Sequence, residues 1–244
     1  MPRWGIFDLY KMLDDIYNFE RPYFATPQYL LDMAAGIAAE LCVPQLCIVG
    51  GAVRDCVLAQ ATGRVARPKD LDVILPTPPK LDKNPNIIAA RKNSLGGYKI
   101  KTKNFGAVDV FQQYTETPEY IITDFFDFNC NSLFYRMRDN AIITSVFFHE
   151  FLESKTIRPQ RVLYARNAVF GQYGVPQTVV RALKFQIKFA EHFDIKTKLS
   201  SDILYMIYNM TQTDEQAMIE YMSTHVSDAR VQKMILKNYQ NIRK

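Results

Sequence analysis

The amino-acid sequence predicts an α+β fold, in which a mixed β-sheet flanked by helices is followed by an all-helical region. Short apolar stretches bounded by glycine and proline, which are typical of strands, occur between residues 46 and 148. From about residue 176 onward, apolar residues recur instead at helical spacing. No glycine- or serine-rich linker separates the two patterns, so we expect residues 1–170 and 171–244 to form two rigidly packed domains.

The composition is that of a folded protein without a membrane partner. Hydrophobic residues make up 48% of the 244 residues, which is enough for a core. The longest apolar runs are shorter than the roughly 18 residues that a membrane-spanning helix needs. The N-terminal segment carries acidic side chains throughout and has no signal-peptide core, so we expect a cytoplasmic location. The net charge of +5 is compatible with a polyanionic partner.

Two helices are expected before the first strand. Apolar residues recur at helical spacing over 8–18 and 27–42, and Pro27 suits the start of the second helix. The apolar run 46–49 then predicts a buried strand, because it is too short for a helix and is stopped by two glycines. Residues 52–60 predict the helix that follows.

The middle of the chain predicts the rest of the sheet. Residues 71–75 form an apolar strand that ends at PTPP, and residues 84–95 predict a helix ended by two glycines. Alternating apolar residues predict further strands at 98–103, 106–112 and 119–123, with one or two more within 131–148. The C-terminal region predicts four helices, at 176–193, 200–211, 214–225 and 227–242.

Two aspartates separated by one residue indicate a metal site. In a strand, Asp70 and Asp72 would project from the same face, where their charges repel unless a cation lies between them. Such oxygen ligands suit Mg²⁺, with Mn²⁺ as an alternative, and Asp109 in the apolar strand AVDVF is the best candidate for a third carboxylate. The alternative is that these aspartates face solvent. The four cysteines and three histidines fit no zinc-binding spacing.

Gly50 and Gly51 predict a phosphate-binding turn between a strand and a helix. Without side chains, the backbone can approach a phosphate closely, and the N–H groups of the helix N-terminus face the anion. Arg54, one turn into the helix, could contact a triphosphate while Asp55 orients the turn. A tight turn with a local surface ion pair would use the same residues.

The combination of these motifs resembles a known family. Residues 48–55 (IVGGAVRD) and 69–73 (KDLDV) are similar to the first motif of the head domain of class II CCA-adding enzymes and bacterial poly(A) polymerases, in the DNA polymerase beta-like nucleotidyltransferase superfamily. Four later segments follow the family order, so the resemblance covers about residues 45–195: NFGAVDV (104–110), DFNCNS (127–132), KTIR (155–158) and RALKF (181–185).

The resemblance implies a role for each matching residue. Residues 1–170 would be the nucleotidyltransferase head, and residues 171–244 the helical neck and body. Asp70, Asp72 and Asp109 would be catalytic and would hold the metal ions. The nucleotide would be bound by Gly50, Gly51, Arg54, Asp127, Asn131 and Arg181.

The chain also departs from the family, and the resemblance is to a shorter and divergent member. Phe125 and Phe126 replace two arginines of the family, which removes positive charge expected near the nucleotide. The family's EDxxR motif, whose Asp and Arg pair with CTP and ATP, reads GVPQT at 174–178. Gln177 could instead bond a base edge. It shares a predicted helix face with three cations that could meet phosphate or RNA, unless this face is merely solvated: Arg181, Lys184 and Lys188.

These observations predict a template-independent RNA nucleotidyltransferase. The 3′-hydroxyl of an RNA, at a tRNA CCA end or a poly(A)-type tail, would attack the α-phosphate of ATP or CTP by two-metal phosphoryl transfer. Two alternatives stay open. One is a catalytically inactive nucleotide- or RNA-binding protein of the same fold. The other is nucleotidyl transfer to a protein or a small molecule.

Overall fold

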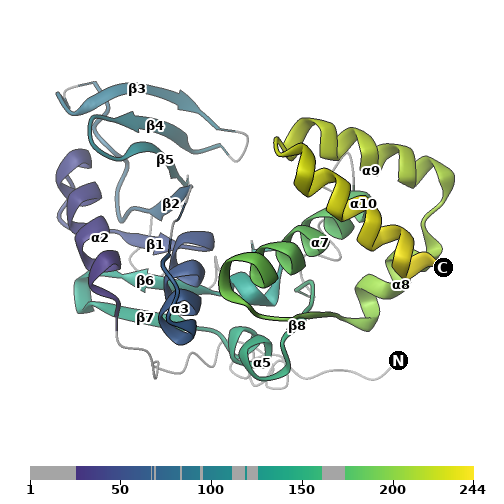
Figure 1. Ribbon diagram of the computed structural model, residues 1–244. Helices are drawn as coiled ribbons and strands as arrows, with labels where there is room; N and C mark the ends of the chain where they lie inside the picture. Colours follow the sequence, from purple (N-terminus) through teal and green to yellow (C-terminus); the bar gives the residue numbers. More distant parts are fainter. Residues whose placement is uncertain are drawn as a thin grey trace, which may run out of the picture. The chain divides into compact units, whose positions relative to one another are not determined.

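The structure is a computed structural model that describes residues 26–66, 68, 70–82, 84–93, 96–111, 119, 126–160 and 174–244. These residues belong to two compact units (Figure 1). The first unit lies within 1–123 and 131–148, and the second within 124–130 and 149–244. The predicted domain boundary near residue 170 lies outside the described residues. The helical unit thus includes a short segment from the middle of the chain as well as the C-terminal region.

The first unit is built on a mixed sheet of seven strands, as the sequence predicts. The strand order is β3-β4-β5-β2-β1-β6-β7. Only β2 and β5 run parallel to each other among these described strands, and every other neighbouring pair is antiparallel. The strands are β1 (Cys47–Val49), β2 (Leu71–Ile74), β3 (Ile87–Lys92), β4 (Tyr98–Thr102), β5 (Gly106–Val110), β6 (Leu133–Arg136) and β7 (Ala141–Thr144).

Two helices flank this sheet. Helix α3 (Gly51–Thr62) packs against β1, β2 and β6, and helix α2 (Gln28–Leu41) contacts α3. Eight consecutive residues of α3, 52–59, are buried, because the helix is covered on all sides by the core. The central strand β1 is buried throughout, and β2 is buried except at Asp72, which explains why their apolar residues do not strictly alternate with polar ones.

The predicted helix over residues 84–95 is wrong, because this segment forms strand β3. It pairs with β4 in an antiparallel hairpin. The two glycines that were expected to end a helix form the hairpin turn, where Gly96 has a φ of +79° and donates its N–H to Asn93 O. The segment IIAARK mixes β-branched residues with helix formers, so the cross-strand pairing decides its structure.

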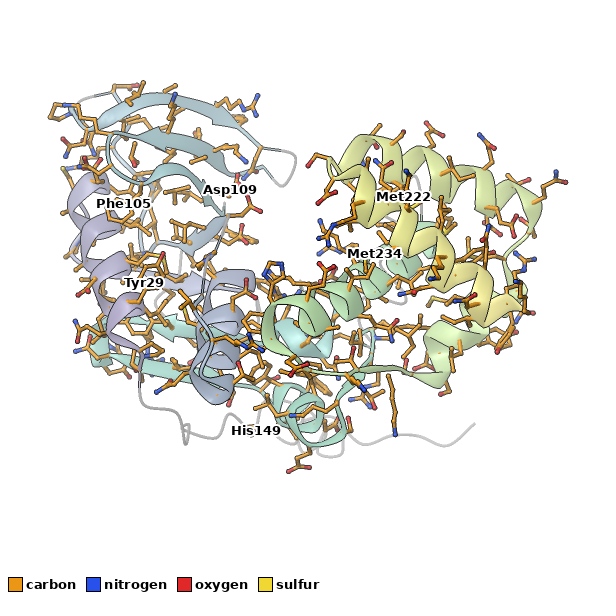
Figure 2. The ribbon with its side chains drawn as sticks, in the orientation of Figure 1. Tyr29, Phe105, Asp109, His149, Met222 and Met234 are labelled. Atoms are coloured by element: carbon orange, nitrogen blue, oxygen red, sulfur yellow. The ribbon has the colours of Figure 1, made fainter. Side chains whose placement is uncertain are left out.

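The turn between β4 and β5 is anchored on helix α2. The buried carboxylate of Glu40 accepts hydrogen bonds from the backbone N–H of Lys103, at 3.1 Å, and from the side chain of Asn104. The ring of Phe105 lies against Gly36, where a Cβ atom would overlap the ring (Figure 2). Helix α2 therefore fixes the position of β5, the strand that carries Asp109.

The second unit is helical, and its four C-terminal helices lie where the sequence predicts them. They are α7 (Gly174–Phe193), α8 (Ser201–Asn209), α9 (Gln212–His225) and α10 (Ala229–Arg243). Sequence analysis missed helix α5 (Val146–Ser154), which leads into this unit, and the short parallel pair β8 (Thr156–Ile157) and β9 (Lys198–Leu199). No helix in the described part of the chain is long and apolar enough to cross a membrane.

Aromatic rings form the centre of the helical unit. Phe185 stacks on Phe189 with ring centroids 5.8 Å apart, and Phe189 packs in turn against Phe151 of α5. Phe128, which follows directly on the predicted nucleotide ligand Asp127, is fully buried and meets Phe185 edge to face at 5.4 Å. Burial of rings of this size is worth several kcal/mol in total, on the order of 1.5–3 kcal/mol each.

Candidate active site

Asp72 and Asp109 lie side by side on the parallel strands β2 and β5. The two residues are direct partners in the strand register. Neighbouring strands are about 4.8 Å apart, and partners in register project from the same face of a sheet. Both side chains are half-buried, whereas their neighbours Val73, Val108 and Val110 point into the core. Figure 2 shows Asp109 on the side of β5 that lies away from α2. The structure thus brings two of the three predicted carboxylates together.

A lysine extends this pair of carboxylates to a third strand. Lys99 on β4 is the register partner of Asp109, and its Nζ lies 3.1 Å from Asp109 Oδ2. On the other side of Asp72, the register partner on β1 is the buried Val49. We call Lys99, Asp109 and Asp72 the charged row. The row ends at the apolar Val49 on the β1 side, whereas on the β3 side the exposed Arg91 is the register partner of Lys99.

Asp70 lies directly before β2 and is exposed. It is two residues from Asp72, so it projects to the same side if the chain remains extended. Within the described ranges, no three His, Cys, Asp or Glu side chains are arranged as a set that could hold a metal ion. The structure therefore shows the pair Asp72–Asp109, and the predicted three-carboxylate metal site stays a prediction.

The glycine turn lies next to this pair. Strand β1 ends at Val49, the register partner of Asp72, and Gly50 follows as the N-cap of helix α3. Gly50 has φ 66° and ψ −128°, a conformation that is accessible essentially only to glycine. The N-terminus of α3 carries partial positive charge and backbone N–H groups that attract anions. An anion-attracting helix end therefore lies beside a pair of carboxylates, as a site for a metal-bound phosphate requires.

Arg54 lies beneath the glycine turn and is engaged inside the protein. Its guanidinium donates to Asp55 Oδ1 from Nε at 2.9 Å and from Nη2 at 2.7 Å, and to Asn131 Oδ1 from Nη1. The Arg54 and Asp55 side chains are only 3% and 5% exposed, so this ion pair is buried rather than on the surface. A Cβ added at Gly51 would lie 3.6 Å from Arg54 Nη2. Arg54 and Asn131, both predicted nucleotide ligands, thus stabilise the glycine turn from inside the protein.

The other predicted charged ligands pair in the second unit. Arg181 on α7 forms an ion pair with Asp127, and the negative charge of Asp127 is the main reason that the pKa of Arg181 is raised. The Arg181 side chain is nevertheless 40% exposed, so part of its surface is open to a ligand. Gln177 lies one turn earlier on the same helix face and is half-buried. Helix α7 therefore presents a polar face that begins with Gln177 and Arg181.

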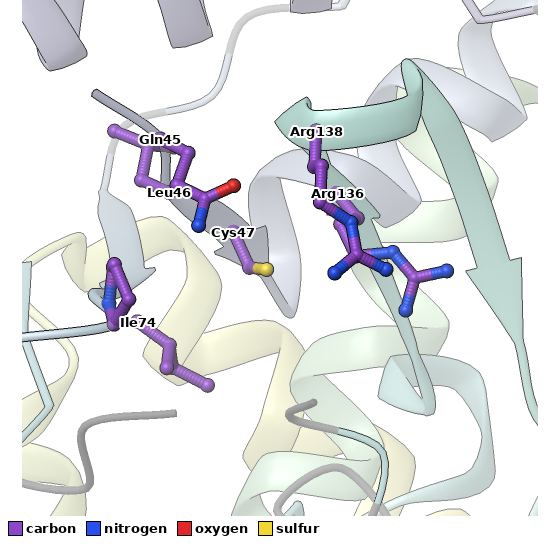
Figure 3. A pocket seen from close by; sticks show the side chains of 7 residues that line it. Gln45, Leu46, Cys47, Ile74, Arg136 and Arg138 are labelled. Atoms are coloured by element: carbon purple, nitrogen blue, oxygen red, sulfur yellow. The ribbon is translucent and has the colours of Figure 1, made fainter. Parts of the chain in front are cut away.

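A small cavity lies at the opposite end of β1 from the charged row. Its lining includes Cys47 and two arginines, Arg136 and Arg138 (Figure 3). Its volume is about 10 Å³, which is room for about one water molecule and far too little for a nucleotide. Arg136 is held by Asp139 at 2.8 Å and by Glu119 at 3.0 Å, and burial raises the pKa of Cys47 to about 12. This cavity therefore offers neither a reactive thiolate nor a nucleotide site.

Solved structures with a similar fold are known. A tRNA-processing enzyme in an apo form aligns with 92% of this chain and 59% of its own, at 17% identity and a TM-score of 0.57. The Thermotoga maritima CCA-adding enzyme complexed with tRNA aligns with 92% of this chain and 54% of its own, at 14% identity and a TM-score of 0.52. The chain has the fold of the CCA-adding enzymes. No family model matches the sequence, and no curated protein matches it.

A third match to the CCA-adding fold is the Bacillus stearothermophilus CCA-adding enzyme in complex with CTP. It aligns with 87% of this chain and 48% of its own, at 18% identity and a TM-score of 0.51. The chain thus spans between about half and three-fifths of the length of these proteins. Likeness at this identity shows the fold alone.

Two residues of the charged row, Asp72 and Asp109, suit a divalent metal. Mg²⁺ is usually held by one or two carboxylates together with phosphate oxygens and water. Asp72 and Asp109 supply two carboxylates on rigid neighbouring strands, and the adjacent helix N-terminus suits a phosphate. Sequence reasoning missed Lys99. Alternation in YKIKT puts Lys99 and Lys101 on one face of β4, but only the strand register shows which of them meets Asp109.

Proposed function

We propose that this chain is a template-independent RNA nucleotidyltransferase that transfers a nucleotide from ATP or CTP to an RNA 3′ end, in the cytoplasm. The observation that carries this proposal is the in-register pair Asp72–Asp109 beside the N-terminus of α3. Lys99 offsets part of the repulsion between these two like charges, and a divalent ion bound by both aspartates would offset it more fully. The fold adds support, because the similar solved structures include CCA-adding enzymes described with CTP and with tRNA.

The reaction joins the RNA to the nucleotide and releases pyrophosphate. The 3′-hydroxyl oxygen forms a bond to the α-phosphorus, the bond from that phosphorus to the pyrophosphate oxygen breaks, and the hydroxyl proton is lost to solvent or a carboxylate. Asp72 and Asp109, with Asp70 nearby in the chain, would hold Mg²⁺ or Mn²⁺. When bound, these ions would stabilise the charge that develops on the phosphoryl oxygens. The helix end at Gly50 and Gly51 orients the triphosphate, and Arg54 holds that turn in place.

An RNA partner is supported by the surface of α10. This helix contains five basic residues if Lys244 at its C-cap is included, and it contains no aspartate or glutamate. Lys233, Lys237 and Lys244 are exposed, and their spacing puts them on one helix face. Arg230 starts the same face and pairs with Glu191 at 2.9 Å. A face of this kind suits an RNA phosphate backbone, for which tRNA is one candidate.

The test is incorporation of each of the four labelled NTPs, supplied separately with Mg²⁺, into an RNA pool. We expect Asp72→Asn and Asp109→Asn to lower incorporation about 100-fold or more, because loss of metal electrostatics costs several kcal/mol and each 1.36 kcal/mol is tenfold in rate. Asp82→Asn removes an exposed carboxylate elsewhere in the first unit and should leave the rate unchanged. Equal rates in all three variants would refute the proposal.

A binding protein without catalysis is the second candidate. Arg54 with Asn131, and Asp127 with Arg181, are engaged with each other, which leaves fewer charged groups for a triphosphate. This candidate predicts NTP or RNA binding with no incorporation of any NTP. If the label is incorporated but survives RNase treatment, the acceptor is a protein or a small molecule instead.

A further inference from the structure

The ammonium group of Lys99 already contacts the Asp109 carboxylate, to which the proposed function requires a metal ion to bind. Lys99 and Asp109 are cross-strand partners, and the ammonium lies 3.1 Å from Asp109 Oδ2. The two side chains are 37% and 23% exposed, so this contact is open to solvent and is made by a long, flexible side chain. The contact is therefore reversible, unlike the buried pair of Arg54 and Asp55.

The position of Lys99 gives it an electrostatic role in the charged row. Asp72 and Asp109 stand side by side with like charge, and Lys99 offsets part of that repulsion from the β4 side. A divalent ion bound by both aspartates would offset the same repulsion. A metal ion about 2.1 Å from an Asp109 oxygen and an ammonium about 3 Å from the same carboxylate repel each other strongly. The two cations therefore compete for one carboxylate.

We propose that Lys99 is an internal counter-ion that competes with the divalent metal for Asp109 and keeps the affinity of the empty site for metal low. This inference rests on the proposed function, because it concerns the same pair of aspartates. Lys99 then leaves Asp109 when the metal arrives and becomes available to an incoming anion such as the triphosphate. Metal uptake without nucleotide is thus disfavoured.

Lys101 is the matched control for this proposal. It lies on the same strand and the same face as Lys99, and it is exposed. Its register partner is Ala107 instead of an acid. Removing the charge of Lys101 therefore changes the net charge of the protein as much as removing that of Lys99, without freeing Asp109.

The experiment measures Mn²⁺ binding to the full chain without nucleotide, from the free-ion signal in electron paramagnetic resonance. We expect Lys99→Met to bind Mn²⁺ about five- to thirtyfold more tightly than the wild type, because a charge within a few ångströms of a carboxylate at partial exposure has an effect of about this size. Lys101→Met should change the dissociation constant less than about twofold, and Lys99→Arg, which keeps the charge, should not tighten binding. Urea unfolding checks that each variant is folded.

The outcomes distinguish failure of the proposed Lys99 competition from failure of the proposed metal site. If Lys99→Met and Lys101→Met bind Mn²⁺ equally while Asp72→Asn abolishes binding, the competition is refuted and the metal site of the proposed function stands. If Asp72→Asn and Asp109→Asn bind Mn²⁺ as the wild type does, or if the wild type and Lys99→Met both bind none, the metal site itself is refuted, and the role of Lys99 is refuted with it. Tighter binding by Lys99→Met alone supports both.

Discussion

The guanidinium group of Arg54 donates a hydrogen bond to the side-chain oxygen of Asn131, which lies 77 residues further along the chain. Asn131 ends a short 3₁₀ helix, η1 (Asn129–Asn131), and both side chains are buried. This contact ties Asn131 to the start of α3, and the ion pair with Asp55 holds the guanidinium group in place. Residues that the motif marks as nucleotide ligands are used here to hold the glycine turn.

Arg54→Met is therefore expected to act mainly on stability. It removes the guanidinium group from the buried Asp55 carboxylate, and breaking a buried ion pair typically costs about 3–5 kcal/mol. Urea unfolding followed by circular dichroism measures this loss. The double variant Arg54→Met with Asp55→Leu should recover much of it, since the buried carboxylate is removed as well. Full stability of Arg54→Met combined with lost NTP binding would instead identify Arg54 as a direct nucleotide ligand.

Gly36 and Phe105 are expected to be energetically coupled. Alanine at position 36 would overlap the Phe105 ring, and overpacking typically costs about 1–3 kcal/mol. In a Phe105→Ala background the same Gly36→Ala change should instead stabilise by up to about 1 kcal/mol, because alanine favours a helix over glycine. A double-mutant cycle from urea unfolding measures the difference. Identical effects of Gly36→Ala in both backgrounds would show that the ring does not rest on α2.

The four cysteines should differ sharply in reactivity. Cys42 is exposed, whereas Cys47, Cys56 and Cys130 are buried. Burial raises the pKa of Cys47 and of Cys56 to about 12, so almost none of their thiolate exists at neutral pH. Iodoacetamide followed by mass spectrometry should show fast labelling of Cys42 in the native protein and labelling of all four in urea. Rapid native labelling of Cys56 would contradict the packing of α3.

Acid should weaken helix α9 through its capping box. Thr211 is the N-cap, and Asp214 accepts hydrogen bonds from the Thr211 backbone N–H and hydroxyl, which lower the pKa of Asp214 below its ordinary value of 3.8. A carboxyl whose pKa is lower in the folded protein stabilises it above the unfolded pKa, and this contribution is lost as pH falls through the folded value. The urea midpoint should therefore decline below about pH 4. Asp214→Asn should show a smaller decline over the same range, and an unchanged decline would argue against the cap.

Charge reversal on α10 should weaken RNA binding. Lys233→Glu with Lys237→Glu replaces two exposed cations of the basic face, and each lost phosphate contact also lowers the salt dependence of binding by about one unit of slope. Fluorescence anisotropy with a labelled RNA, repeated at several salt concentrations, measures both effects. Lys80→Glu with Lys92→Glu makes the same change in net charge in the first unit and serves as the control. Equal losses in the two double variants would mean that only net charge matters.

Local features of this site could be predicted from the sequence. Only glycine adopts the backbone conformation found at Gly50, so a Gly-Gly pair after an apolar run indicates a sharp turn into a helix. Alternation along a strand puts Asp109 on the opposite side from Val108 and Val110, as the structure confirms. These inferences need only the chain within a few residues of the feature.

Features that depend on distant partners could not be predicted in the same way. Residues 84–95 have no strong preference of their own, and pairing with β4 makes part of them a strand. The sequence suggests that Arg54 could contact a nucleotide, yet in the fold its guanidinium group bonds to Asn131 and Asp55. The pairing of Lys99 with Asp109 follows only from the register of β4 with β5.

The anchoring of the β4–β5 turn by Glu40 makes the candidate active site depend on a helix that supplies none of its charged residues. A slip of β5 by one residue along β2 would rotate every side chain of the strand to the other face. Asp109 would then enter the core in place of a valine, and a valine would stand beside Asp72. By holding the turn, Glu40 helps to keep β5 in the register that puts Asp109 beside Asp72, although it lies in neither strand.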